Sequence, residues 1–314
     1  KQYIDLLSPP DKVYFEGKPI TVATSIVAYN LSEETNIALF CTLDGYGENS
    51  KISYTYQKAI PGVLGEKRYS VVCTFEDGLI VKSENSDFFD TRRGVMTLSY
   101  SSNAKSNWCL YMLSKSALED YNLRNKDPLE EIKRRDPQCI SGNNAGATIP
   151  EFVSAEQLVF GVLDDQPFTQ GRDYFWQLTL KEAFDYKGNL DKLDSVYVYV
   201  PQPASLATED SSCQFETSSE IEGYNYRLKK DAIDFVNQDC TSTALKKTGV
   251  SVDECIQRFK EDVSFGCPLR IQGLTSSGVL PEKVVVKAYA NYSYELRQSF
   301  IVAIKKLPAT PTKE

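Results

Sequence analysis

The sequence predicts a mainly β protein of two β-sandwich domains in tandem, stapled by disulfides and carrying short helical insertions. Three observations lead to this fold class. Short apolar segments alternate with polar residues at a period of two and are separated by turn residues such as Asp44-Gly45. Eight cysteines occur without a single histidine. The chain has 314 residues, more than one hydrophobic core usually occupies, so two domains are expected.

The cysteines are expected to form cystines. Metal sites and thiol nucleophiles usually recruit histidine as a ligand or base, and this chain has none. The number of cysteines is even and no C-x-x-C pair occurs. Buried free thiols in a reducing compartment are the alternative. Cystines would place the chain in an extracellular or cell-surface location.

Residues 1–102 are predicted to form the first sandwich, with strand candidates at 19–29, 36–43, 51–57, 68–75, 79–83 and 95–101. Cys41 and Cys73 fall on apolar, inward faces 32 positions apart, which predicts a disulfide between them. The segments 40–43 (FCTL) and 72–75 (VCTF) resemble those of an immunoglobulin-like domain. The tryptophan that usually lies between the two cysteines is missing, which leaves the sandwich topology open.

Residues 103–150 are predicted to form a helical linker or insertion that a Cys109–Cys139 disulfide closes. One helix is expected at 116–122 and a second from Asp127, which caps it, followed by Pro128 at the first position and Glu130 completing a capping box. Acidic residues precede basic ones, as the helix dipole favours. The charges therefore need no binding role.

Residues 151–307 are predicted to form a second β-sandwich-like domain with a helical insertion at about 226–262, and 308–314 a tail. Its strand candidates are 157–163, 174–180, 195–200, 269–272, 284–294 and 299–305, the last two forming a hairpin around 295–298. Nested pairing is the simplest connectivity for its cysteines, Cys213 with Cys267 and Cys240 with Cys255, although many other pairings exist.

We nominate no catalytic residue, cofactor or metal. Without histidine, the common triads and zinc sites lose their base or ligand, and no dinucleotide, Walker or nucleophile-elbow motif occurs. Asp164-Asp165 and the series Asp185, Asn189, Asp191 and Asp194 could supply oxygen ligands to calcium but lack the spacing of an EF-hand loop, so solvated turns are the simpler interpretation. With 43 acidic and 35 basic residues the net charge is -8, which argues against nucleic acid as a partner.

Asn30 and Asn291 begin N-x-S sequons and are predicted glycosylation sites. No apolar run approaches the roughly 18 residues of a membrane helix. The chain is therefore expected to be soluble, with any signal or anchor beyond its ends.

Two function classes remain. The leading prediction is a non-enzymatic extracellular structural or adhesive protein, as an ectodomain or a subunit of a filament or surface assembly. The segments 288–294 and 299–304 resemble strands near the membrane end of secreted, anchored surface proteins of archaea. This resemblance implies a membrane anchor beyond Glu314, or completion by a strand from a neighbour. Expected partners are a protein or a glycan at a cell surface, self-association included.

The alternative prediction is a carbohydrate-binding or carbohydrate-active secreted protein. In it, Trp108 and Trp176 would form a sugar-stacking platform, although their apolar neighbours favour core packing. Whether these two side chains line an open groove with paired carboxylates or lie buried discriminates between the two classes.

Overall fold

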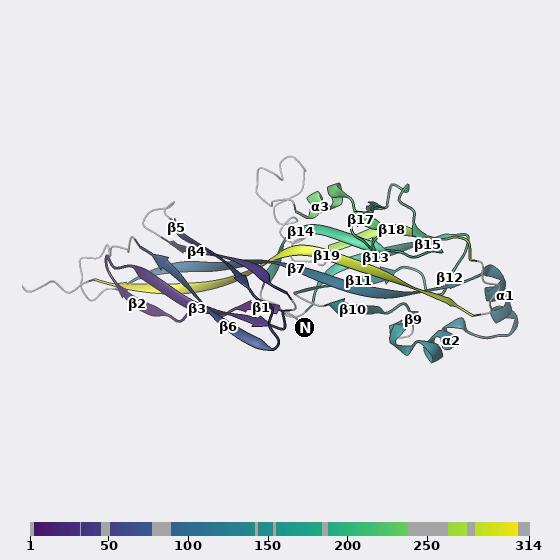
Figure 1. Ribbon diagram of the computed structural model, residues 1–314, viewed down its shortest axis with the longest axis horizontal. Helices are drawn as coiled ribbons and strands as arrows, with labels where there is room; N and C mark the ends of the chain where they lie inside the picture. Colours follow the sequence, from purple (N-terminus) through teal and green to yellow (C-terminus); the bar gives the residue numbers. More distant parts are fainter. Residues whose placement is uncertain are drawn as a thin grey trace, which may run out of the picture. The chain divides into compact units, whose positions relative to one another are not determined.

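The computed structural model describes residues 3–31, 33–44, 51–76, 89–141, 144–152, 155–183, 188–237, 263–274 and 280–306 (Figure 1). It is mainly β, as predicted. The chain divides into two compact units, which we describe one at a time. The first contains Lys1–Ser101, Lys187–Asn189 and Tyr294–Glu314, and the second contains Ser102–Tyr186 and Leu190–Ser293.

Two sheets form the first unit. One has the strand order β1-β3-β6 and the other contains β5, β4, β7 and β19, with β2 paired to β19. The strand bounds are β1 Tyr3–Leu6, β2 Lys12–Phe15, β3 Ile20–Tyr29, β4 Thr35–Asp44, β5 Lys51–Ile60, β6 Glu66–Phe75, β7 Phe89–Leu113 and β19 Glu282–Lys305. The unit receives only the beginning of β7 and the end of β19.

Alternation of apolar residues builds the core of this unit. In β4, Ile37, Leu39, Cys41 and Leu43 are buried, and Cys73 lies on the buried face of β6. Cys41 and Cys73 form the predicted disulfide with their Cα atoms 6.4 Å apart, so it joins the two sheets. The predicted strand at 79–83 lies outside the described residues.

The last strand differs from the prediction. Residues 284–305 were expected to form a hairpin within the second domain, but β19 is one strand whose final residues belong to the first unit. The residues expected to form the turn explain why the strand continues. Segment 295–298 contains no glycine, proline or asparagine to form a turn, and Leu296 is buried in register with Tyr294. Similarly, β7 continues through residue 103, where the helical linker was expected to begin.

The second unit also contains two main sheets. One has the order β11-β13-β18-β15, and the other β16-β17-β14-β19-β7, with β10 and β12 paired to β7, while β8 and β9 form a small ribbon. The bounds are β8 Ile140–Ser141, β9 Asn144–Ala145, β10 Thr148–Phe152, β11 Glu156–Val162, β12 Phe168–Thr169, β13 Asp173–Glu182, β14 Gly188–Tyr199, β15 Ala204–Leu206, β16 Phe215–Thr217, β17 Tyr226–Leu228 and β18 Val263–Ile271.

Short helices follow β7 and β17 in the second unit, and the one that begins at Pro128 has the predicted cap. α1 spans Lys115–Leu123, α2 Pro128–Arg135 and α3 Lys230–Val236, and a 3-10 turn, η1, spans Pro137–Cys139. Asp127 caps α2 by accepting the Leu129 N–H at 2.8 Å. The Glu130 carboxylate pairs with Lys133. Of the predicted insertion at 226–262, the structure describes β17 and α3; residues 238–262 lie outside the described part.

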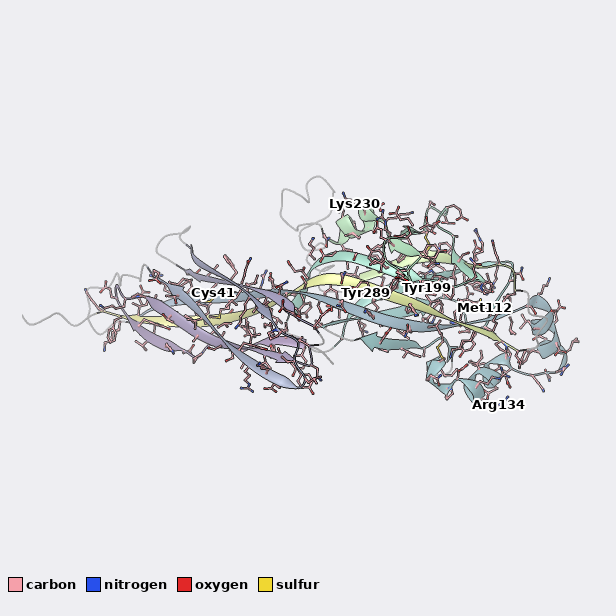
Figure 2. All side chains as sticks on the ribbon, viewed as in Figure 1. Cys41, Met112, Arg134, Tyr199, Lys230 and Tyr289 are labelled. Atoms are coloured by element: carbon pink, nitrogen blue, oxygen red, sulfur yellow. A yellow bond between two sulfur atoms is a disulfide. The ribbon has the colours of Figure 1, made fainter. Side chains whose placement is uncertain are left out.

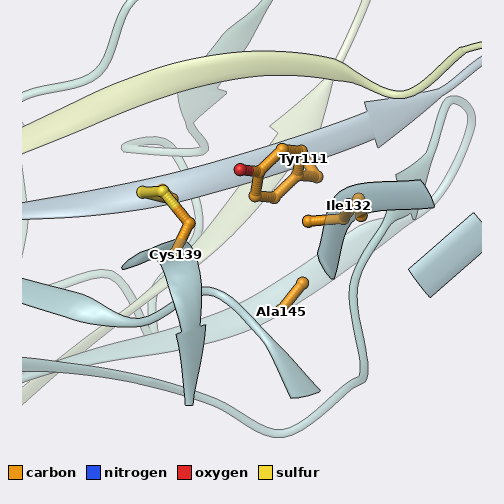
Figure 3. Packing of buried hydrophobic residues seen from close by; sticks show 5 residues of the cluster. Tyr111, Ile132, Cys139 and Ala145 are labelled. Atoms are coloured by element: carbon orange, nitrogen blue, oxygen red, sulfur yellow. A yellow bond between two sulfur atoms is a disulfide. The ribbon is translucent and has the colours of Figure 1, made fainter. Parts of the chain in front are cut away.

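A disulfide holds the helical segment of the second unit in place, as predicted. Cys109 on β7 is bonded to Cys139 in η1. Tyr111, Ile132 and Ala145 pack around this bond in a small buried cluster (Figure 3). The Tyr111 hydroxyl donates to Asp136 Oδ2 at 3.0 Å, and Lys283 Nζ contacts Asp136 Oδ1 at 3.1 Å. The segment is thus attached to both β7 and β19.

An aromatic chain fills the core of the second unit. The ring centroids of Trp108 and Phe160 are 5.5 Å apart, those of Phe160 and Trp176 are 5.8 Å apart, and those of Trp176 and Phe215 are 5.5 Å apart. The four residues come from β7, β11, β13 and β16, so this row of aromatic rings connects the two sheets of the unit. Cys213 and Cys267 form the third predicted disulfide.

Candidate functional site

The residues singled out in the sequence do not converge on one site. Three predicted disulfides lie in the cores, and Cys240 and Cys255 lie outside the described residues. Trp108 and Trp176 are each only 1% exposed, so neither side chain can stack on a sugar. Core packing, which their apolar neighbours favoured, is therefore confirmed for both.

The two sequons occupy different settings. Asn30 lies just after β3 with φ 51°, and its Oδ1 accepts the Gly65 N–H at 2.7 Å. Asn291 lies within β19, where its half-buried side chain accepts the Tyr289 hydroxyl at 2.5 Å. Ser32, the last residue of the first sequon, lies outside the described residues.

The acidic residues considered for calcium are dispersed. Asp164 pairs with Arg172 at 3.2 Å, and Asp194 pairs with Lys192 at 2.7 Å. Within the described parts of the chain, no three potential metal ligands gather in one place. Asp164 and Asp165 lie in the connection between β11 and β12, as the solvated-turn interpretation predicts, but Asp191 and Asp194 lie within β14, and Asp185 lies outside the described residues.

One shallow hollow of about 560 Å³ lies beside α1 and α2. Its lining consists of charged side chains of α2 and of the connection that precedes it, together with Tyr121 of α1. The charges on α2 pair along the helix, Lys133 with Glu130 at 2.9 Å and Arg134 with Glu131 at 2.7 Å. The hollow therefore has the character of a solvated helix surface.

The strongest candidate surface is the outer face of the sheet that contains β14 and β19 in the second unit. In β14, Val196 and Val198 are buried, so the half-buried Tyr197 points to the opposite face. In β19, Ala288 and Ala290 are buried while Tyr289 points outward. Tyr199 and Tyr289 are labelled in Figure 2.

A third tyrosine joins them from the connection between β16 and β17. The ring of Tyr224 lies 6.4 Å from that of Tyr197 and 6.1 Å from that of Tyr289. Lys105 Nζ lies 5.3 Å from the centre of the Tyr289 ring, a cation–π contact. We call Tyr197, Tyr224 and Tyr289 the tyrosine face.

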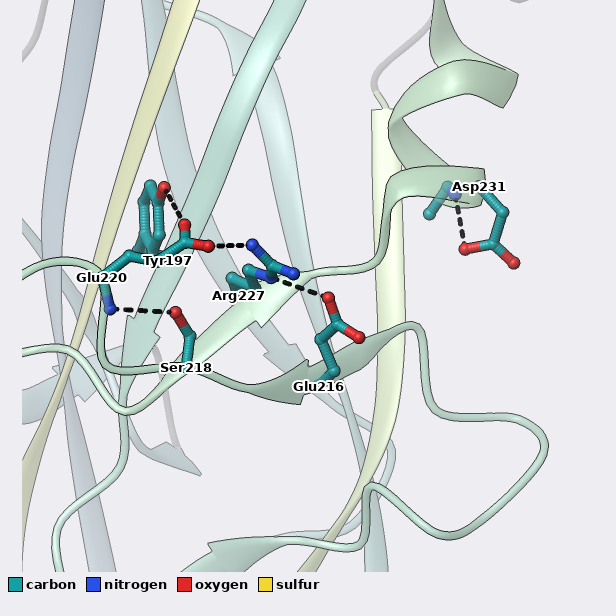
Figure 4. A network of polar contacts seen from close by, with 7 residues as sticks. Tyr197, Glu216, Ser218, Glu220, Arg227 and Asp231 are labelled. Atoms are coloured by element: carbon teal, nitrogen blue, oxygen red, sulfur yellow. Dashed lines mark hydrogen bonds and ion pairs between the residues drawn. The ribbon is translucent and has the colours of Figure 1, made fainter.

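Ionic groups border the tyrosine face. The Tyr197 hydroxyl donates to Glu220 at 3.0 Å, and Arg227 pairs with both Glu220 and Glu216 (Figure 4). Burial, followed by the hydrogen bond to Glu220, raises the pKa of Tyr197 above its ordinary value. Burial, followed by the nearby charge of Glu151, raises the pKa of Tyr224. Both hydroxyls are therefore protonated donors at neutral pH.

Hydrogen bonds between side chains and the backbone hold the tyrosine face in position before any partner binds. The side chain of Asn225 accepts the Val200 N–H and donates to the Val200 oxygen, both at 2.9 Å. The amide thus acts as a strand partner for β14 and holds the neighbouring Tyr224. The Ser218 hydroxyl accepts the Glu220 N–H in the same connection. A surface fixed in this way loses little side-chain entropy when it binds.

Composition alone did not indicate this convergence. The chain contains 19 tyrosines, and the alternation in β14 and β19 shows only that Tyr197 and Tyr289 face away from a core. That both belong to neighbouring strands, and that Tyr224 reaches them from a connection, depends on the pairing of the sheet.

Comparison with known proteins adds no relative to this description. No protein-family model matches the chain, and no curated protein matches it. Among the described helices, none is long and apolar enough to cross a membrane. The fold and surface define a mainly β, disulfide-stapled protein of two compact units with a tyrosine-bearing face on the second.

Proposed function

We propose that this protein is a non-enzymatic, extracellular structural or adhesive surface protein that contacts its partner through the tyrosine face. The observation that carries the proposal is the different placement of the tryptophans and of the tyrosines of the tyrosine face. Both tryptophans are buried in the core of the second unit, whereas three tyrosines meet on an outer sheet face beside Arg227 and Lys105. Tyrosine and arginine are, with tryptophan, the residues most enriched where protein interfaces concentrate their binding energy.

The disulfides support the extracellular part of the proposal. Three cystines, spread over both units, indicate an oxidising setting. They stabilise each unit chiefly by restricting the unfolded chain. A protein exposed at a cell surface benefits from this because it cannot rely on intracellular chaperones. The sequence resemblance to anchored surface proteins of archaea agrees with such a location.

We further propose that the first unit is immunoglobulin-like. Two sheets joined by a cystine, and the parallel pairing of β2 with the last strand, support this assignment. The position of the cystine differs from that in antibody domains. In antibody domains it joins strands B and F, which in this chain order correspond to β3 and β7, whereas here it joins β4 and β6.

Carbohydrate binding is the second candidate, and one observation favours it. The tyrosine face combines aromatic rings with the polar groups of Asn291, Glu220 and Arg227, a combination that also suits sugars. The burial of Trp108 and Trp176 counts against a tryptophan platform. A glycan ligand would therefore depend on the tyrosines alone for stacking.

Binding to cell envelopes tests both candidates. The fluorescently labelled chain is titrated onto envelopes of the source organism, untreated, protease-treated or periodate-treated. We expect a double substitution, Tyr224→Ala with Tyr289→Ala, to weaken binding by about tenfold or more. Loss of binding after protease treatment indicates a protein partner, and loss after periodate treatment indicates a glycan.

The matched control is Tyr3→Ala with Tyr29→Ala. These two tyrosines also form a contact between half-buried rings, with centroids 5.2 Å apart, but they lie in the first unit. The control should bind like the parent chain. If the Tyr224 and Tyr289 variant is folded and binds with unchanged affinity, the tyrosine face is not the contact surface.

A further inference from the structure

Strand β2 of the first unit has a partner strand on one side. It pairs in parallel with β19, with Val13 opposite Ala303 and Phe15 opposite Lys305. Among the residues that the structure describes, no strand pairs with its other edge. Such an edge is a template for another strand, and proteins usually protect it with charges, proline or a bulge.

The free edge exposes the backbone of particular residues. The Glu16 N–H donates to the Lys305 oxygen at 2.9 Å, so the backbone of Glu16, and of Tyr14 two residues before it, faces β19. Neighbouring residues point their N–H and C=O groups the opposite way. Those of Val13 and Phe15 therefore face the open edge. The Phe15 oxygen also accepts the Lys18 N–H, and a carbonyl has a second lone pair available.

Apolar side chains accompany this edge. Val13 is 57% exposed, Phe15 is 48% exposed and Ile301 is 49% exposed. Val13 and Phe15 share one face of β2, and Ile301 lies two residues before Ala303, the partner of Val13, on the same face of β19. Exposed apolar groups gathered at an open strand edge are typical of an interaction surface.

We propose that β2 pairs with the same strand of a second copy of the chain, antiparallel about a two-fold axis at Tyr14. This register places Val13 opposite Phe15 of the second copy, and the backbone groups of both face the new neighbour. The two Val13–Phe15 pairs then exchange four hydrogen bonds across the axis. The interface is isologous, so it closes as a dimer.

The charges of the side chains favour this register over the registers shifted by two residues. With the axis at Tyr14, Lys12 of each copy lies opposite Glu16 of the other, which places opposite charges at both ends of the pairing. Sliding the strands by two residues one way opposes Lys12 to Lys18. Sliding them the other way opposes Lys12 to Tyr14 and removes both attractive pairs. The side chains thus favour a single alignment.

The β2 edge belongs to the first unit and shares no residue with the tyrosine face, so its self-association is separate from the proposed partner contact. A short strand pairing with a small apolar patch falls below the size of a standard stable interface. The dimer is therefore weak and reversible. On a cell surface, where copies are concentrated, such contacts join neighbouring molecules.

Sedimentation velocity of the purified whole chain, without any ligand, tests the proposal from low micromolar to near-millimolar concentration. We expect a concentration-dependent dimer that Val13→Pro abolishes, because this substitution removes an N–H that faces the open edge and leaves the ladder to β19 intact. Lys12→Glu or Glu16→Lys alone should weaken association by about tenfold, since each substitution opposes like charges at both ends. The combined exchange of Lys12 and Glu16 should restore it to within about threefold.

Leu64→Lys serves as the control, because Leu64 is 99% exposed and lies elsewhere in the same unit. This substitution should leave the dimer unchanged. Circular dichroism verifies folding, and Phe15→Lys replaces Val13→Pro if the latter is unfolded. A monomer at every concentration overturns the proposal. So does a dimer that persists in the Val13 and Phe15 variants, or a charge exchange that fails to restore association.

Discussion

Substitution of Gly94 by alanine tests whether the C-terminal strand completes the first unit. Gly94 lies on β7 opposite Leu43 of β4, and a Cβ atom added there would fall well inside contact distance of the Phe300 ring. Phe300 is only 4% exposed, so the ring cannot simply swing into solvent. Overpacking of this kind typically costs about 1 to 3 kcal/mol.

We expect Gly94→Ala to lower the free energy of unfolding by that amount. For a unit of this size, the melting temperature should fall by roughly 3 to 10 °C. Thermal and urea unfolding, followed by far-ultraviolet circular dichroism with the disulfides intact, provide the measurement. Gly161→Ala is the matched control, because Gly161 also lies in a strand but has no atom within 4 Å of the added Cβ. It should be neutral or stabilise by about 0.5 kcal/mol.

A double-mutant cycle links the effect to Phe300. The smaller side chain of Phe300→Leu should make room for the new methyl group, so the two substitutions should show a coupling energy of at least about 0.5 kcal/mol. A Gly94→Ala variant as stable as the parent, or a cycle without coupling, would refute the packing of β19 against β7 in this unit.

Three further predictions concern stability. Reduction of the disulfides should lower the melting temperature, since loss of each native cystine typically costs about 2 to 5 kcal/mol; an unchanged melting point after verified reduction would contradict this. Burial alone would raise the pKa of Asp136, but hydrogen bonds from Lys283 and Tyr111 outweigh it and hold this pKa below its ordinary value. The carboxylate therefore contributes stability that is present above about pH 5 and is lost as the pH falls through its lowered folded pKa. Asp136→Asn should be less stable than the parent at pH 7 by about 1 to 3 kcal/mol, and the difference should shrink below about pH 4 in acid-unfolding curves; a constant difference would exclude this role. Trp108→Phe should destabilise about 1 kcal/mol more than Trp176→Phe in urea unfolding, because Trp108 Nε1 donates to the Gly146 oxygen at 2.9 Å, while Trp176 Nε1 has no acceptor among the described residues; equal losses would contradict this.

Face alternation made several features predictable. Cys41 and Cys73 each fall on the apolar side of a strand, which is a local property of the chain, and their pairing followed from it. The start of α2 was equally local, because a capping carboxylate and a proline at the first position act within one turn. The burial of Trp108 followed from its apolar neighbours.

Other features depended on partners distant in sequence. A strand's alternation reports which residues are buried but not which strand lies beside it, so β19 gave no sign that its last residues complete the first unit. The tyrosine face arose in the same way. Tyr197 and Tyr289 were recognisable as outward-facing, yet their meeting with Tyr224 required the neighbouring positions of β14 and β19.

By itself, the sequence therefore determined the mainly β class, the inward position of the cysteines in the first unit and the capped start of α2. These depend on interactions within a few residues. Only the tertiary structure decided that β19 contributes to both units, that no described strand covers the second edge of β2 and that the tyrosines converge. Each of these depends on long-range strand pairing, which is selected by the packing of the whole core rather than by any local segment.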